Sequence, residues 1–147
     1  NIPLIRYAEV LLTYAEAKIE MNQIDNTVYD AINKVRVRAG LPAVDQAKYS
    51  TQEQMRTLVR RERRVELALE GLRWYDVQRW KIGEQVMNGP VYGCRVSDID
   101  ASGNVTYTST SHVKIEDRVF DPAKNYLWPV PQAQMDLNKN LTQNPGY

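Results

Sequence analysis

RRERRVELALEGLRWYDVQRWK, residues 60–81, places seven basic and four acidic side chains among apolar residues at helical spacing. Two opposite interpretations fit such a stretch. It is either a basic arm for nucleic acid or a helix whose charges pair inside the protein. The angular positions of its side chains around a helix distinguish the two.

Residues 55–72, drawn with 100° per residue, predict one core-facing stripe. The residues on this predicted stripe, which lie within about 40° of Val65, are Leu58, Val65, Leu69 and Leu72. Glu62 falls at its edge, about 60° from Val65. Leu67 lies on the opposite side among arginines, where a purely solvated face would not need a leucine.

The charges of this helix form like-charged columns at a spacing of four residues: Arg56, Arg60 and Arg64 in one, and Glu62, Glu66 and Glu70 in the other. Each such pair costs an isolated helix about 0.2–0.5 kcal/mol, so we expect partners from outside the helix. Because acids are interspersed, a structural ion-pair network is favoured over a nucleic-acid arm. The residues that we expect in this network are Glu62, Arg63, Glu66, Glu70, Arg73, Asp76 and Arg79.

The whole chain has the composition of a single globular domain. It has 147 residues, of which 43% are hydrophobic and 25% charged, and its 19 Lys and Arg nearly balance its 18 Asp and Glu. No chain-wide charge attracts nucleic acid or membranes. Cys94 is the only cysteine and His112 the only histidine, which excludes an intrachain disulfide and a metal site built from several histidines of this chain. We predict no catalytic residue, metal site or cofactor.

Residues 3–88 have the apolar period of helices. Residues 3–21 and 28–40 predict a helical hairpin, with Pro3 in its first turn and Gly40 at its end. The hairpin is about as long as one tetratricopeptide repeat, but no second copy follows, so a repeat and an ordinary hairpin both remain open.

Two more helices are expected after this hairpin. Ser50 and Glu53 have the spacing of a capping box, and a third helix should run from there to Gly71. A fourth should start near Leu72 and continue to Val86.

Residues 89–147 change to shorter, extended patterns. VYGCRVSDI (91–99) and VTYTST (105–110) predict two strands of a hairpin around an ASGN turn, and VKIEDRV (113–119) a third extended piece. YLWPVP (126–131) is expected to be extended, with one short helical turn after it. We therefore predict a mainly α chain with a small β-hairpin and an irregular end.

Three stretches resemble the C-terminal part of the SusD/RagB family of bacterial nutrient-binding outer-membrane lipoproteins. They are LIRYAEVLLTYAEAK (4–18) with NKVRVRAGLP (33–42), the opening stretch (60–81), and YLWPVPQAQMDLNKNLTQNPGY (126–147). They occur in the family's order and extend over nearly the whole chain. The resemblance implies tetratricopeptide-like helical pairs. It also implies that the chain is a fragment of a longer lipoprotein, whose lipid anchor is not the mid-chain Cys94.

The function implied by this resemblance is non-catalytic capture of oligosaccharide or another nutrient at the cell surface. Delivery would be to a TonB-dependent outer-membrane transporter of the SusC type. Because aromatic rings stack on sugars, our candidate ligand residues are Tyr92, Tyr107 and Trp128; the resemblance itself marks none. The alternative is a cytoplasmic helical-repeat scaffold for protein interactions, which a signal peptide in the upstream coding sequence would exclude.

Overall fold

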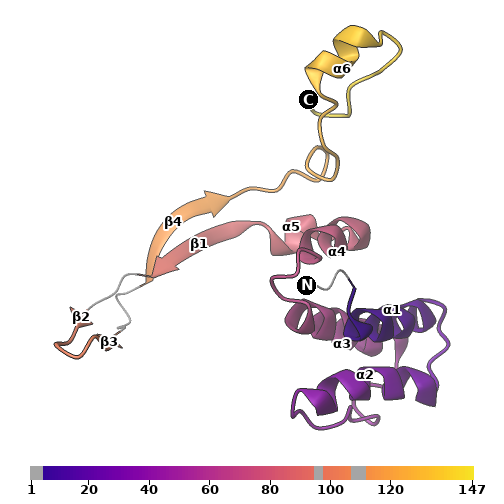
Figure 1. The fold of residues 1–147 in the computed structure, drawn as a ribbon. Coiled ribbons are helices and arrows are strands. Elements are labelled where there is room, and N and C mark those ends of the chain that lie inside the picture. The colour runs from indigo at the N-terminus through magenta and orange to yellow at the C-terminus, as the bar shows by residue number, and fades with distance from the viewer. Residues whose placement is uncertain (1–4, 95–97, 107–111) are drawn as a thin grey trace. The chain divides into compact units, whose positions relative to one another are not determined.

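The computed structural model describes residues 5–94, 98–106 and 112–147. The chain divides into two compact units, Asn1–Trp74 and Tyr75–Tyr147, which we describe separately. Helices dominate the structure and the strand pairs are small (Figure 1). The predicted fold class, mainly α with a small β-hairpin, is confirmed.

The first unit begins with the predicted helical pair, α1 (Tyr7–Glu20) and α2 (Asn26–Arg38). The Asp25 carboxylate caps α2 by accepting the N–H of Thr27. Hydrogen bonds from Lys18 and Thr27 lower the pKa of Asp25 to about 2. The cap therefore joins the start of α2 to the last turn of α1.

Each helix of the pair is followed, two residues after its end, by a residue with left-handed backbone. Gly40 has φ 74° as expected, and Leu41 N–H donates to the carbonyl of Arg36 at 2.9 Å. Asn22, with φ 56°, is the left-handed residue that follows α1. The start of α1 differs from the prediction: Arg6 has extended backbone and the helix begins after it, while Pro3 lies outside the described residues.

The third helix, α3 (Gln52–Glu66), is capped one residue later than predicted. Thr51 and Gln54 form the capping box, rather than Ser50 and Glu53. Thr51 Oγ1 accepts from Gln54 N–H at 3.3 Å, and Gln54 Oε1 accepts from Thr51 N–H at 3.1 Å. Both pairs fit the sequence pattern of a capping box, so spacing alone does not choose between them.

The predicted run of α3 to Gly71 is wrong, because the helix ends at Glu66. Leu69 and Gly71 both have left-handed backbone, with φ 65° and 80°. The predicted fourth helix is also interrupted. It consists of α4 (Arg73–Trp80) and α5 (Gly83–Val86), separated at Lys81, which has φ 52°.

The early end of α3 corrects its predicted core stripe. The residues of α3 that are buried are Met55, Leu58, Val59, Glu62 and Arg63. Val65 is 68% exposed and Leu69 is fully exposed, whereas Leu67, which we expected opposite the core stripe, is buried. The projection placed the stripe near Val65 because it included Leu69 and Leu72, and neither of these residues belongs to the helix.

The core of the first unit lies where α1 packs against both α2 and α3. Its fully buried side chains include Leu12 and Ile19 of α1, Val28 and Ile32 of α2, and Met55 and Val59 of α3. Small residues, Ala8 and Ala15 of α1 and Ala31 of α2, let the backbones approach. This is a tetratricopeptide-like helical pair with a third helix beside it.

The charged columns of α3 pair with α1 and α2. Arg56 and Arg60 contact Glu20 of α1 at 2.6 and 3.6 Å. Two charges of α3 are themselves buried, Glu62 and Arg63. Glu62 accepts from Arg36 of α2 at 2.6 Å, and Arg63 lies 3.7 Å from Glu16 of α1.

Four further residues of the predicted network lie toward the end of the opening stretch. Glu66 accepts from Arg6 and Arg38 at 3.0 and 2.6 Å, and Glu70 accepts from Arg6 at 2.6 Å. Asp76 and Arg79 pair with each other within α4 at 2.8 Å. Arg73, the seventh predicted member, is the first residue of α4.

The strands of the second unit pair differently from the prediction. β1 (Gly89–Cys94) pairs antiparallel with β4 (His112–Arg118), which includes all but Val119 of the segment predicted as a separate third piece. The ASGN turn connects only β2 (Asp98–Ile99) and β3 (Val105–Thr106). In sequence, the β2–β3 pair therefore lies between β1 and β4, and the predicted turn belongs to that inner pair.

The C-terminal residues pack against residues 126–130. Tyr126 lies in a turn rather than in extended backbone, and the short helix after Pro131 is present as α6 (Gln132–Leu137). The Gln143 side chain bonds both N–H and C=O of Val130, at 2.8 and 3.0 Å. The irregular end of the chain is thus held by side-chain hydrogen bonds to backbone.

Phe120 and Tyr126 close the small core next to α5. Their rings meet edge to face with centroids 4.8 Å apart. The Tyr126 hydroxyl accepts the N–H of Gly83 at 2.7 Å and donates to Glu84. Partial burial and this bond to Glu84 raise the pKa of Tyr126, and the same hydroxyl lowers the pKa of Glu84.

We expect Glu62→Ala to lower the free energy of unfolding by about 3–5 kcal/mol, because Arg36, whose side chain is 13% exposed, would lose its carboxylate in a buried site. Chemical denaturation of the variant and the unsubstituted protein measures this difference in the free energy of unfolding. The matched control, Glu53→Ala, removes an exposed carboxylate from the same helix and should cost less than about 1 kcal/mol. Equal effects of the two variants would contradict a buried pair.

Gly83→Ala should destabilise the protein by about 1–3 kcal/mol through overpacking. A Cβ at Gly83 would lie 2.3 Å from Cζ of the Phe120 ring. At Gly93 a Cβ would lie 2.9 Å from Cδ1 of Ile115, the flexible end of that side chain, and in ordinary contact with the carbonyl oxygen of Val113, so Gly93→Ala is the control and should cost less. Thermal unfolding compares the stability of the two variants. Adding Phe120→Leu to Gly83→Ala should recover part of the lost stability.

Candidate functional site

The aromatic residues predicted as ligand contacts lie on separate segments of the second unit. Tyr92 lies on β1 opposite Lys114 and is 59% exposed. Trp128 is 71% exposed, and its backbone carbonyl accepts from the Asn144 side chain at 2.6 Å. Tyr107 lies outside the described residues. The rings of Tyr92 and Trp128 thus meet the first requirement for stacking, which is accessibility.

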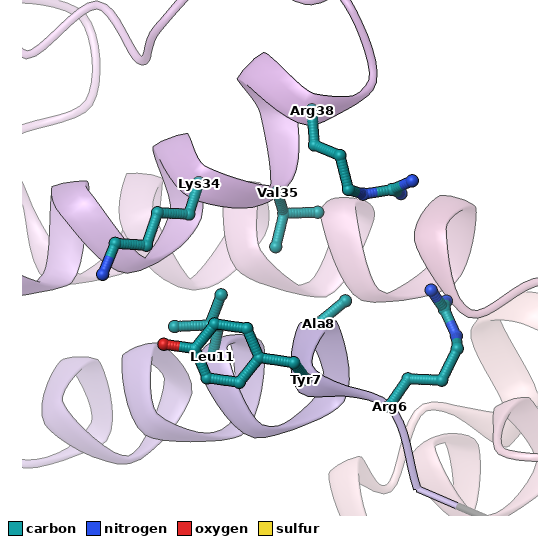
Figure 2. A pocket seen from close by; sticks show the side chains of 7 residues that line it. All are labelled: Arg6, Tyr7, Ala8, Leu11, Lys34, Val35 and Arg38. Atoms are coloured by element: carbon teal, nitrogen blue, oxygen red, sulfur yellow. The ribbon is translucent and has the colours of Figure 1, made fainter. Parts of the chain in front are cut away.

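A pocket of about 540 Å³ lies between α1 and α2 in the first unit (Figure 2). Its lining residues are Arg6, Tyr7, Ala8, Leu11, Lys34, Val35 and Arg38. The volume falls within the range of ligand sites, and the lining is mainly apolar with basic groups around it. Figure 2 shows the Tyr7 ring beside Leu11, with Lys34 and Arg38 above them on α2.

The basic residues of this pocket differ in how their charge is balanced. Arg6 is bound to Glu66 and Glu70, and the Glu70 bond contributes most to raising the pKa of Arg6. Arg38 shares Glu66 but keeps a 61% exposed side chain. Lys34 is exposed on α2 and also lines a second hollow on the outer side of that helix. Positive charge is therefore available at the α2 side of the pocket.

The pocket is complementary to a partner surface that has apolar groups at its centre and negative charge along one edge. Sequence reasoning predicted a helix over residues 3–21 but no pocket beside it. A signal was present: Tyr7, Leu11 and Tyr14 recur at helical spacing on another side of α1.

Two kinds of feature are absent from the described residues: a cluster of metal ligands and a helix that could span a membrane. In residues 5–94, 98–106 and 112–147, no three His, Cys, Asp or Glu side chains gather so that they suit a metal ion. His112 is exposed at the start of β4. None of the helices in this part of the chain has the length and apolar character that a membrane span requires.

Comparison with known proteins gives one consistent family. The family model described as the SusD family matches residues 1–147. The curated SusD-like protein P2 of Formosa agariphila is 33% identical over 152 residues, which cover 99% of this chain and 26% of that protein. SusD-like protein P38 of the same organism is 34% identical over 99 residues.

Solved structures agree with this match. A SusD-like protein from Bacteroides fragilis superposes with a TM-score of 0.78 at 34% identity, covering 98% of this chain and 25% of that one. A SusD homolog from Bacteroides thetaiotaomicron gives a TM-score of 0.68 at 31% identity, with 97% and 26% covered. The chain spans about a quarter of the length of these relatives. Matched along its whole length by the family model, it belongs to the SusD family.

Proposed function

We propose that this chain is part of a surface protein that binds oligosaccharide or another nutrient without catalysis. The observation that carries the proposal is the family match, which extends from residue 1 to residue 147. In this proposal residues 1–147 are the C-terminal region of a longer protein, helical over 3–88 and built from a hairpin and an extended segment over 89–147.

The helical first unit acts in this proposal as a scaffold. Its opening stretch is engaged with neighbouring helices: Arg56 and Arg63 of α3 pair with Glu20 and Glu16 of α1. Charges used in this way stabilise packing and are less available to a ligand. This supports a role of the arginine-rich helix in structure rather than in nucleic-acid binding.

The exposed aromatic rings of the second unit are the proposed ligand contacts. Tyr92 and Trp128 present faces on which a sugar ring can stack, and the hydrogen bond from Asn144 fixes the backbone at Trp128. A fixed aromatic platform loses little conformational entropy on binding. Tyr107 is a third candidate on sequence grounds alone.

The proposed partner is a TonB-dependent outer-membrane transporter of the SusC type, to which the bound nutrient is delivered. The protein would be held at the cell surface by a lipid anchor outside these 147 residues. This proposal rests on the family and not on any contact in the structure.

The complete protein that contains this chain should bind at least one member of a panel of bacterial, plant and algal oligosaccharides in calorimetry. Trp128→Ala should weaken that binding by about two- to tenfold, the value of one aromatic contact. Tyr92→Ala tests the second ring in the same way.

The matched control for both variants is Tyr75→Ala, which removes an equally exposed ring from α4. Binding that all three substitutions leave unchanged would remove Tyr92 and Trp128 from the site while keeping nutrient binding. If the complete protein bound no member of the panel and no other nutrient available to its source organism, that result would contradict the proposed function.

Affinity isolation of the complete protein from its native outer membrane should recover a TonB-dependent barrel. The physical reason is that delivery requires a lasting contact between binder and transporter. The control is the same isolation with the protein's anchor cysteine replaced, which should reduce recovery. A protein found in the cytoplasm with soluble partners would instead support the helical-repeat scaffold.

A further inference from the structure

The last residues of the chain fold back along the segment before α6 (Figure 1). The Asn144 side chain donates to the Trp128 carbonyl at 2.6 Å, and the Tyr147 hydroxyl donates to the Leu127 carbonyl at 3.0 Å. These bonds tie Tyr147 to the backbone beside Trp128, while the two residues remain 45% and 71% exposed. Two accessible aromatic rings are therefore held on one piece of backbone.

Lys124 packs against the same returning segment. A Cβ added at Gly146 would lie 2.9 Å from Cβ and 3.2 Å from Cγ of Lys124, so a larger residue there would force the lysine to move. Gly146 also has left-handed backbone, with φ 84°, which glycine adopts readily. The Lys124 amine lies 4.5 Å from the centroid of the Tyr147 ring, within the range of a cation–π contact. Both the stem and the amine of this lysine are thus positioned by the chain's last residues.

The charge of Lys124 is not balanced by a carboxylate of the described residues. Across 5–94, 98–106 and 112–147, its amine has no ion pair, whereas Lys139 pairs with Asp136 at 3.8 Å. The Tyr147 ring carries no net charge, so the contact orders the amine without neutralising it. We call Lys124, Trp128 and Tyr147 together the C-terminal platform; it combines exposed rings with one positioned cation.

This combination of groups is complementary to a sugar that carries negative charge. A flat aromatic ring packs on the apolar C–H face of a sugar, as it does on other apolar surfaces. A lysine ammonium is a compact point charge with three donors, which suits a carboxylate or a sulfate oxygen. Because the amine is already ordered by Tyr147, an anion that binds it pays little for fixing the lysine side chain.

We propose that the C-terminal platform binds acidic oligosaccharides, whose negative group is a carboxylate or a sulfate ester. Trp128 stacks on one sugar ring, and Lys124 bonds the negative group of the same ring or its neighbour. Tyr147 is a positioning residue that holds the amine. This inference rests on the proposed nutrient binding and adds to it the class of nutrient, with Lys124 as the residue that distinguishes acidic from neutral sugars.

Calorimetry on the complete protein tests the class of nutrient. The probes are oligogalacturonate and oligoalginate, which carry carboxylates, and carrageenan oligosaccharides, which carry sulfate. Each is compared with its own neutral form, made by carboxyl reduction or by desulfation. At least one acidic probe should bind about tenfold more tightly than its neutral form, the value of a hydrogen bond to a charged group. The carboxylate and sulfate pairs distinguish the two sources of negative charge, and added salt should weaken the preference.

Substitution of Lys124 tests the residue. Lys124→Gln should lower the affinity for the acidic probe to that for its neutral form, and Lys124→Arg, which keeps the charge, should retain most of the preference. Lys139→Gln is the matched control from the same unit and should change neither affinity. Should Lys124→Gln fail to fold, acetylation of the unsubstituted protein gives the same answer: bound acidic probe should protect Lys124 and leave Lys139 reactive.

Equal affinity for every acidic probe and its neutral form would overturn this inference while leaving nutrient binding intact. A preference for the acidic probe that Lys124→Gln preserves would also overturn it, because the negative group would then bind elsewhere. Acetylation of Lys124 at the same rate with and without the probe would have the same meaning. Failure of the complete protein to bind any oligosaccharide or other nutrient would instead contradict the proposed function, and this inference with it.

Discussion

The helical unit depends on two adjacent buried charges of α3. Glu62 pairs with Arg36 of α2, and Arg63 pairs with Glu16 of α1. Neighbouring residues on a helix point about 100° apart, so each charge reaches a different helix. Because an unpaired buried charge costs several kcal/mol, a placement of α3 that separated either pair would be destabilised. The apolar core gives this arrangement its stability, and the two ion pairs select its register.

The sequence predicted the need for these pairs but not the partners. Like-charged columns and the position of Glu62 both indicated that α3 has partners outside itself. Spacing within one helix, however, says nothing about which distant residue faces it. Arg36 and Glu16 lie in ordinary amphipathic patterns, and only the packing of three helices brings them to α3. The same limit applies to Arg6, which bonds Glu66 and Glu70 from sixty or more residues away.

Errors in the predicted elements have a common physical origin in local alternatives of similar energy. Two overlapping sequences with the capping-box pattern precede α3, and only that of Thr51 and Gln54 forms the box. The apolar period continues past Glu66, but Leu69 and Gly71 adopt left-handed backbone and end the helix. In the second unit, the segment nearest to β1 in sequence is rich in strand formers, yet β1 pairs with the more distant β4. Pattern reasoning favours the nearest partner, whereas in the structure the predicted turn connects only the short strands β2 and β3.

Trp128 illustrates what a structure adds to an aromatic motif. Beside two prolines, a tryptophan is either a plug that closes a core or a platform that a ligand can reach, and composition does not separate these. Here Asn144 and Gln143 hold the backbone of residues 128–130, while the ring stays 71% exposed. Phe120 and Tyr126, a few residues earlier, supply the core contact instead. A rigid backbone under an accessible ring is the arrangement that stacking requires, because little ordering cost is left for the ligand to offset.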